Sequence, residues 1–249
     1  MKIRNLSGCT LEENKTRWLL KCAAEGASEF EIISGKTSTR VLVLDKALAL
    51  KAWRVGTEGK ERLFFSEATV LEQEDGLAMH SLGKNEFDLY VYPKAVGDLI
   101  MIGGKMVPIP GESTFSGYRF TLPKVEVPVQ SYFIGERKLV LKLPEQIPGG
   151  LNDLHLMLDY TGDTAMGFID GELVLDEFYK GMPWQIGLRK FYPAAGGKEL
   201  VFYLRPLHKN ATFLPDLDPE DVPDFGKSDQ VLEVKGLEFV PEYFCVIKY

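Results

Sequence analysis

Hydrophobic and polar residues alternate with a period of two along most of the chain. Residues 86–92 (EFDLYVY) and 199–204 (ELVFYL) show this alternation clearly, and β-branched and aromatic residues, which fit a pleated surface, are frequent in such segments. Similar segments bounded by Gly, Asn, Asp or Pro occupy residues 30–33, 40–44, 138–143, 154–160 and 231–240. Short strands separated by turn residues are typical of antiparallel sandwiches, so the pattern predicts an all-β fold.

Helix-forming signals are confined to one short segment. Residues 45–53 begin with an aspartate suited to an N-cap and continue with good helix formers, but they span barely two turns. We therefore expect at most one or two short helices. A (β/α)₈ barrel of about 250 residues needs eight helices alternating with strands, so this fold is excluded.

The strand pattern is interrupted at residues 106–113 (MVPIPGES) by two prolines and a glycine. We expect two antiparallel β-sandwich domains, one over residues 1–107 and the other over residues 112–249. Residues 213–225 are acidic and rich in proline, which donates no hydrogen bond to a sheet. This segment is predicted to be a long surface loop.

Composition and charge narrow the classes of function. The 249 residues carry a net charge of −7 and no cluster of Lys and Arg longer than a pair, so nucleic acid is not an expected partner. No apolar run approaches the about 20 residues that span a bilayer, so no membrane partner is expected. Three widely spaced cysteines argue against a disulfide framework. The compartment stays open between the cytoplasm and, with an export signal outside this sequence, the periplasm or the exterior.

Residues 167–188 (GFIDGELVLDEFYKGMPWQIGL) concentrate acidic and aromatic side chains. Asp170 and Gly171 form the strongest hairpin signal in the chain, because a type I′ turn requires positive φ at both central positions. The turn predicts that residues 172–178 return antiparallel to residues 165–169. Trp184 is expected to lie at the edge of the core, with stacking on a sugar as the alternative.

Candidate carbohydrate-binding residues come from the same region. Aromatic rings offer apolar faces, and carboxylates accept hydrogen bonds from sugar hydroxyls. The alternation along one strand allows Glu172 and Asp176 to share a face, which raises a paired-carboxylate glycosidase as an alternative to a solvated strand. The candidates are Trp184, Tyr179, Asp176, Glu172 and Tyr160.

Neither a metal site nor a catalytic triad stands out. The three histidines, His80, His155 and His208, are scattered, and none has a second ligand at i+2 or i+4. No G-x-S-x-G nucleophile elbow occurs. Three acids open a segment that begins like a calcium-binding EF-hand loop: Asp216, Asp218 and Glu220. However, Asp221 replaces the required glycine and Lys227 stands at the twelfth position. We expect no catalytic residue and no cofactor, with a calcium site in this loop as the alternative.

Several motifs carry a family resemblance. In the second half they are LDYTGD (158–163), FIDGEL (168–173), FYKG (178–181), PWQIGL (183–188) and LVFYLRPL (200–207), and upstream they are VLDKALALKAW (43–53) and FDLYVYP (87–93). The chain resembles, over most of its length, the C-terminal β-sandwich region of bacterial family-35 glycoside hydrolases, the β-galactosidases. The resemblance implies that the second domain is a galactose-binding-like jelly roll. The catalytic glutamates of that family lie on a (β/α)₈ barrel, so none is carried over to this chain.

The sequence thus favours a non-catalytic, carbohydrate-associated accessory module of a glycoside hydrolase with weak glycan binding. The expected partner is a glycan or a glycoside hydrolase catalytic domain. Two alternatives stay open: a purely structural module that docks on such a domain, and a small glycosidase in its own right. The sugar and the oligomeric state are not determined.

Overall fold

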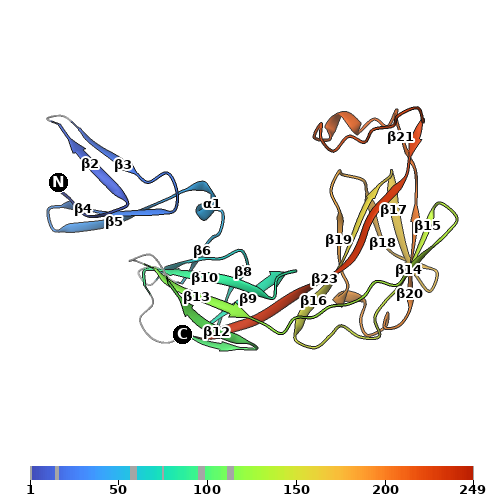
Figure 1. Cartoon of the computed structure of the whole chain (residues 1–249), viewed down its shortest axis with the longest axis horizontal. Coiled ribbons are helices and arrows are strands. Elements are labelled where there is room, and N and C mark those ends of the chain that lie inside the picture. Colours follow the sequence, from blue (N-terminus) through green and yellow to red (C-terminus); the bar gives the residue numbers. More distant parts are fainter. Residues whose placement is uncertain are drawn as a thin grey trace.

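The computed structural model describes residues 2–14, 17–56, 61–74, 76–94, 99–110 and 115–248, and Figure 1 shows an elongated molecule built almost entirely of strands. The expected all-β, antiparallel sandwich fold is confirmed. Helical structure in the described part consists of α1 (Lys46–Ala49) and two short 3₁₀ turns, η1 (Arg189–Phe191) and η2 (Leu214–Asp216). No helix within these ranges is long and apolar enough to cross a membrane.

The strands follow one another along the chain as β1 (Lys2–Ser7), β2 (Cys9–Glu13), β3 (Trp18–Cys22), β4 (Ala27–Ser34), β5 (Thr37–Leu44), β6 (Ala52–Val55), β7 (Arg62–Phe65), β8 (Thr69–Gln73), β9 (Gly76–Leu82), β10 (Glu86–Tyr92), β11 (Ile100–Ile102), β12 (Lys105–Ile109), β13 (Ser116–Thr121), β14 (Ser131–Ile134), β15 (Lys138–Lys142), β16 (Leu151–Thr161), β17 (Thr164–Ile169), β18 (Glu172–Phe178), β19 (Trp184–Gly187), β20 (Glu199–Leu204), β21 (Leu207–His208), β22 (Gln230–Val231) and β23 (Glu233–Lys248).

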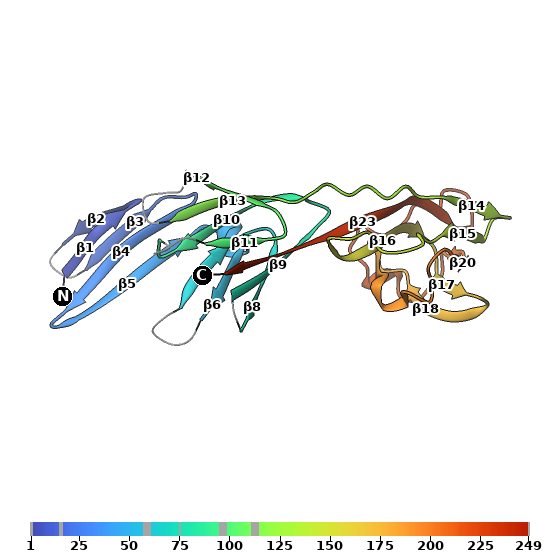
Figure 2. The same cartoon turned by 90° about the horizontal axis from the view of Figure 1, so that it is seen from below.

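One end of the molecule carries two small sheets. The sheet β1-β4-β5 and the hairpin β2-β3 lie together at this end (Figures 1 and 2). Helix α1 follows, and the carboxylate of Asp45 caps it by accepting a hydrogen bond of 2.7 Å from the amide of Leu48. Hydrogen bonds from the backbone of Leu48 and Gly26 lower the pKa of Asp45. The helix is shorter than expected because Trp53 pairs with Phe64 in the ladder between β6 and β7.

The middle of the molecule is a sandwich of two sheets. A five-stranded sheet in the order β12-β13-β10-β7-β6 packs against β8, β9, β11 and the end of β23. Leu89 in β10 and Met79 in β9 are fully buried in the shared core. The rings of Phe87 and Phe120 stack with their centroids 5.4 Å apart.

A second sandwich occupies the other end. Its five-stranded sheet, in the order β14-β15-β20-β17-β18, faces β19, β16 and the first part of β23. Alternating leucines of β16, including Leu156 and Leu158, meet Phe202 of β20 in a core that excludes water. The predicted hairpin is confirmed, since Asp170 has φ of 54° and Gly171 has φ of 83°, the values that a type I′ turn requires.

The 16-residue strand β23 joins the two sandwiches. It pairs with β16 and then with β9, so a single sheet in the order β19-β16-β23-β9-β8 belongs to both halves (Figure 2). Residues 122–130 lie against this core in an extended conformation, where the hydroxyl of Tyr243 accepts a 3.0 Å hydrogen bond from the amide of Val125. The expected boundary at residues 107–112 stays a prediction, and strand pairing crosses it through β13 and β23.

Candidate functional site

The three aromatic candidates from the sequence lie in the core. Trp184 is 7% exposed and packs edge-to-face on Phe202, with the centroids 5.8 Å apart. Tyr160 and Tyr179 are also buried, and the hydroxyl of Tyr179 donates a 3.0 Å hydrogen bond to the carbonyl of Asp221. Burial raises the pKa of Tyr160 well above its ordinary value. The core interpretation of Trp184 is confirmed, and these three rings offer no open face to a sugar.

The two acidic candidates do not share a face of strand β18. Glu172 pairs with Ile169 on β17, and Asp176 pairs with Met166, but a β-bulge lies between the two pairs. Directly paired residues lie on the same face, whereas Ile169 and Met166, three positions apart in β17, lie on opposite faces. The expectation of a common face is therefore wrong, because the bulge shifts the alternation by one residue. Both acids are exposed, but they cannot act as a carboxylate pair on one surface.

The calcium candidates Asp216, Asp218 and Glu220 lie in the predicted surface loop, of which η2 forms a part. They do not gather around a common point. In the described ranges, only one group of at least three histidine, cysteine or acidic residues brings its ligand atoms within 4.8 Å of one another, and it lies elsewhere: Asp153, His155 and Glu242.

An apolar row crosses the outer face of the C-terminal five-stranded sheet. Each member pairs directly with the next across the five strands, and the row is Tyr132, Val140, Val201, Phe168 and Leu173. The inner face is made by the neighbouring positions, such as Leu139 and Phe202, which belong to the core. Tyr132 and Leu173 at the two ends of the row are 52% and 55% exposed, Val201 and Phe168 are half-buried, and Val140 is buried at 1% exposure. A sheet face of this kind, on edge strands and with aromatic rings, is unusual for a surface that contacts water alone.

Polar groups flank the apolar row. The hydroxyl of Tyr132 donates a 3.2 Å hydrogen bond to Glu199, and this bond raises the pKa of the tyrosine. Lys142 pairs with Glu199 in the ladder and extends the polar side. On the other side, Asp176 lies opposite Met166 on the same outer face. Of the acids predicted from the sequence, Asp176 is thus the one that shares the outer face with the apolar row.

A histidine–carboxylate cluster lies on the outer face of the six-stranded sheet, near the point where β23 passes from one sandwich to the other. We use this name for Asp153 and His155 of β16, Glu242 of β23 and His80 of β9. The carboxylate of Glu242 joins the two histidines: Oε1 lies 3.0 Å from Nδ1 of His80, and Oε2 lies 3.2 Å from Nε2 of His155. Side chains of these three residues are each less than one-fifth exposed.

Amide side chains and backbone groups hold the cluster in place. Asn152 donates a 2.9 Å hydrogen bond to Glu242, and the amide of Gln185 lies 3.0 Å from Nδ1 of His155. Burial would raise the pKa of Glu242, but hydrogen bonds with Asn152, His155 and His80 hold it below its ordinary value. An open hollow of about 420 Å³ beside the cluster connects it to solvent.

Sequence reasoning missed this cluster. The sequence contains one signal for it: Asp153 lies two positions before His155, and residues i and i+2 of a strand share a face. Glu242, in contrast, lies 87 residues from His155 and 162 residues from His80. Only the pairing of β23 with both β16 and β9 brings these residues together.

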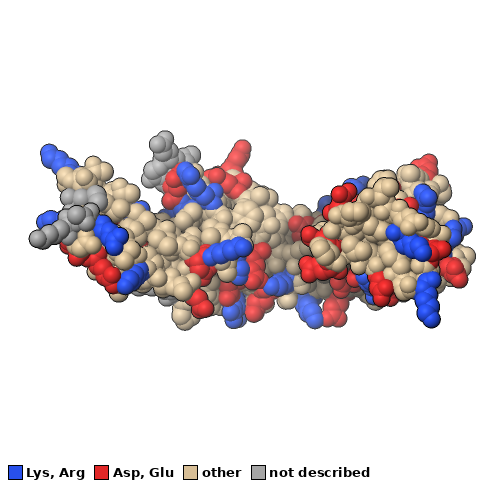
Figure 3. All heavy atoms as spheres, turned by 90° about the horizontal axis from the view of Figure 1, so that it is seen from above, with Lys and Arg blue, Asp and Glu red and all other residues tan. Residues whose placement is uncertain are grey.

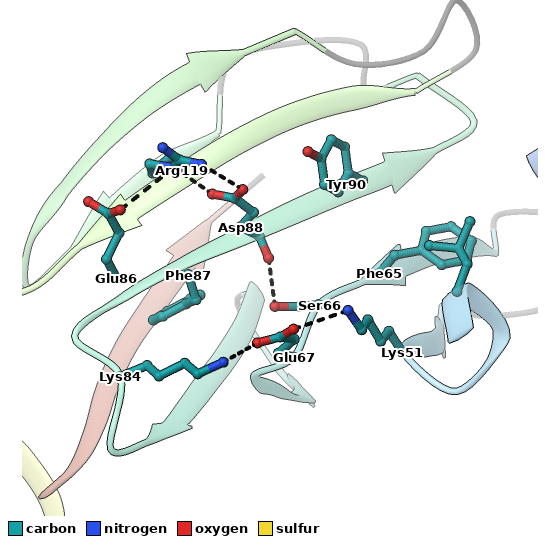
Figure 4. Close-up of a pocket in the computed structure, with 11 residues that line it drawn as sticks. Lys51, Phe65, Ser66, Glu67, Lys84, Glu86, Phe87, Asp88, Tyr90 and Arg119 are labelled. Carbon is teal, nitrogen blue, oxygen red and sulfur yellow. Dashed lines mark hydrogen bonds and ion pairs between the residues drawn. The ribbon is translucent and has the colours of Figure 1, made fainter. Parts of the chain in front are cut away.

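A neighbouring hollow of about 330 Å³ is lined by paired charges (Figure 4). Glu67 bridges Lys51, at 3.1 Å, and Lys84, at 2.5 Å, and these contacts lower its pKa to about 2. Arg119 binds both carboxylate oxygens of Asp88, at 2.8 and 2.9 Å. Each of these charges has a partner, so we interpret the hollow as an ion-pair network on the sheet surface.

The wider surface has mixed charge. Figure 3 shows acidic and basic side chains interspersed over the visible face, without a broad field of one sign. Neither a family model nor a curated protein sequence matches the chain.

Proposed function

We propose that the chain is a non-catalytic, carbohydrate-associated accessory module of a glycoside hydrolase, which binds glycan weakly on the outer face of its C-terminal sheet. The observation that carries the proposal is the apolar row from Tyr132 to Leu173 with acids beside it. The enzyme class comes from the resemblance to the C-terminal region of family-35 β-galactosidases. Because Trp184 is buried, we place the glycan-binding site on the outer face of the sheet instead of at this tryptophan.

The chemistry of this face suits a sugar chain. The apolar C–H groups of a pyranose pack on aromatic and aliphatic side chains, while its hydroxyls donate hydrogen bonds to carboxylates. Phe168 and Tyr132 supply apolar surface, and Glu199 and Asp176 supply acceptors on either side. The exposed ends of the row, Tyr132 and Leu173, are four strand spacings of about 4.8 Å apart, or about 19 Å, and this separation exceeds the length of one sugar ring. We therefore expect oligosaccharides to bind more tightly than monosaccharides.

The test is a titration with galactose, lactose and β-galactan oligosaccharides, followed by heteronuclear NMR. Tyr132 and Phe133 make a matched pair, because they are adjacent on β14, are each 52% exposed and point to opposite faces. Y132A should weaken oligosaccharide binding at least tenfold, about 1.4 kcal/mol, while F133A should leave it unchanged. Equal effects of the two variants, or no shifts at about 10 mM oligosaccharide, would refute glycan binding at this face.

Hydrolysis of galactosides is measured on the same samples. Turnover by the wild-type chain that survives in Y132A would contradict the non-catalytic assignment and would support the small-glycosidase alternative. The variants keep the core intact, since Tyr132 lies on an edge strand with a single neighbour, β15.

Docking on a catalytic domain is the second candidate function. It is favoured by further exposed apolar side chains on and near the opposite edge strand, where Phe178 is 70% exposed and Met182 is 59% exposed. If this function is correct, a family-35 catalytic barrel added in trans will slow amide hydrogen exchange in β17 and β18. Unchanged exchange at saturating barrel would exclude this docking surface.

A further inference from the structure

We propose that the histidine–carboxylate cluster binds a zinc-like divalent transition-metal ion through Asp153, His155 and Glu242. The ligand atoms of these three residues all lie within 4.8 Å of one another. The three residues come from two adjacent strands of the sheet that both sandwiches share. The inference goes beyond the proposed function, because it concerns a different surface and a different ligand.

The spacing of the donor atoms fits such an ion. In a tetrahedral site with bonds of about 2.0 Å, neighbouring ligand atoms lie about 3.3 Å apart. Nε2 of His155 and Oε2 of Glu242 are already 3.2 Å apart. An ion bound to both would replace their direct hydrogen bond without a large movement of either strand.

Asp153 is held with one oxygen engaged and the other available. Its Oδ1 accepts hydrogen bonds of 2.7 Å from the amides of Leu154 and Arg189. The second oxygen, Oδ2, lies on the side of Gly187, where a β-carbon would come within 2.9 Å of it. Glycine at this position keeps open the space in which Oδ2 could ligate.

The orienting contacts match those of a metal-binding imidazole. Such a histidine uses one ring nitrogen as ligand and donates the other N–H to a neighbouring oxygen. The side-chain amide of Gln185 lies 3.0 Å from Nδ1 of His155, and rotating that amide by 180° presents its oxygen to Nδ1–H. His80, at 3.0 Å from Oε1 of Glu242, holds the carboxylate from its other side.

Charge also favours a cation. Two partly buried carboxylates, Asp153 and Glu242, lie side by side in the cluster. Among the residues that the structure describes, no side-chain nitrogen of a lysine or arginine lies within 4.0 Å of a carboxylate oxygen of Asp153 or Glu242. Imidazole together with carboxylate selects zinc and related ions over calcium or magnesium, which prefer oxygen ligands alone. The fourth position would face the hollow, which provides a path for the ion to enter.

The position of the ion predicts a structural role. Glu242 pairs with Asp153 of β16 and with Leu82 of β9, so it lies where β23 passes from one sandwich to the other. A cation bound there would tie β16 to β23 at the junction. We therefore expect zinc to raise the thermal unfolding temperature of the wild-type chain.

The experiment is calorimetric titration of zinc chloride into the tag-free chain after chelator treatment. Wild-type protein should bind one zinc ion, and D153N, H155Q and E242Q should each bind at least tenfold more weakly. The matched control is H208Q, because His208 is an exposed histidine outside the cluster and should not affect zinc binding. Cobalt provides a second readout, since its intense tetrahedral absorption should appear in the wild type and be lost in the three ligand variants.

A variant that leaves all three ligands in place guards against misfolding. Q185A removes only the orienting amide and should weaken zinc binding by about ten- to a hundredfold. The proposal is overturned by absent binding even at about 1 mM zinc, by equal affinity in the ligand variants, or by loss of binding in H208Q. Tighter binding of calcium than of zinc would also overturn it. None of these results bears on glycan binding at the apolar row.

Discussion

Replacing Trp184 by alanine should destabilise the chain without changing its affinity for a glycan. The indole is 7% exposed and packs on Phe202 from the facing sheet. A buried tryptophan removes about 200 Å² from water, which at about 25 cal/mol per Å² corresponds to about 5 kcal/mol. That figure is an upper bound, because the unfolded chain already buries part of this surface.

The expected loss of unfolding free energy for W184A is about 3–4 kcal/mol, within the range of about 3–5 kcal/mol for truncation of a buried tryptophan or phenylalanine to alanine. The assay is urea unfolding followed by circular dichroism, at equal protein concentrations. F178A is the control, because Phe178 is 70% exposed and its loss should cost no more than about 0.5 kcal/mol. A W184A variant as stable as F178A, or one that is stable but fails to bind oligosaccharide, would refute the assignment of Trp184 to the core.

Three further predictions concern thiols, a turn and a carboxylate. Cys245 should resist thiol reagents in the folded chain, because burial raises its pKa to about 12. Cys9 and Cys22 pair across β2 and β3, so oxidised glutathione should join them in a disulfide while it is itself reduced to glutathione. G171A should cost about 1 kcal/mol in urea unfolding, because φ at this position is 83°. The pKa of Glu67, lowered by its two lysine partners to about 2, should appear as a titration midpoint near that value in carboxyl NMR. Ionised Glu67 therefore stabilises the folded chain above the unfolded pKa of about 4.3, and this stabilisation is lost as the pH falls through about 2. The stabilisation should be small, because the side chain of Glu67 is half exposed.

Each of these three predictions has a control or an outcome that would contradict it. Rapid labelling of all three cysteines in the folded chain would contradict the burial of Cys245, and peptide mapping identifies the oxidised pair. G149A should be neutral, since Gly149 has no atom within 4 Å of an added β-carbon. K84M should move the Glu67 midpoint upward, and an unchanged midpoint would show that Lys84 does not lower it.

Local signals predicted much of the fold. Strand β10 has the same bounds as the alternating segment 86–92, and β20 has those of 199–204. The turn at Asp170 and Gly171 was predictable because its conformation depends on two residues alone. The helix expected over residues 45–53 is shorter because pairing of β6 with β7 overrides local propensity.

Long-range pairing accounts for what the sequence did not reveal. The single bulge in β18 places Glu172 and Asp176 on opposite faces, and no neighbouring residue in the sequence predicts this bulge. Strand β23 looks like an ordinary C-terminal strand, yet it pairs with both sandwiches. The apolar row likewise depends on the register of five strands. Burial of Trp184, by comparison, follows from its place in an alternating apolar segment.

Glycan binding at the outer face of the C-terminal sheet is the proposal on which the assigned function depends. Its most direct test is to map, residue by residue, the NMR shifts that β-galactan oligosaccharide induces in the wild-type chain. We predict saturable shifts at Tyr132, Val201 and Phe168, with the resonances of Trp184 unmoved. Shifts centred on the core around Trp184 or on the histidine–carboxylate cluster, or no shifts, would contradict it.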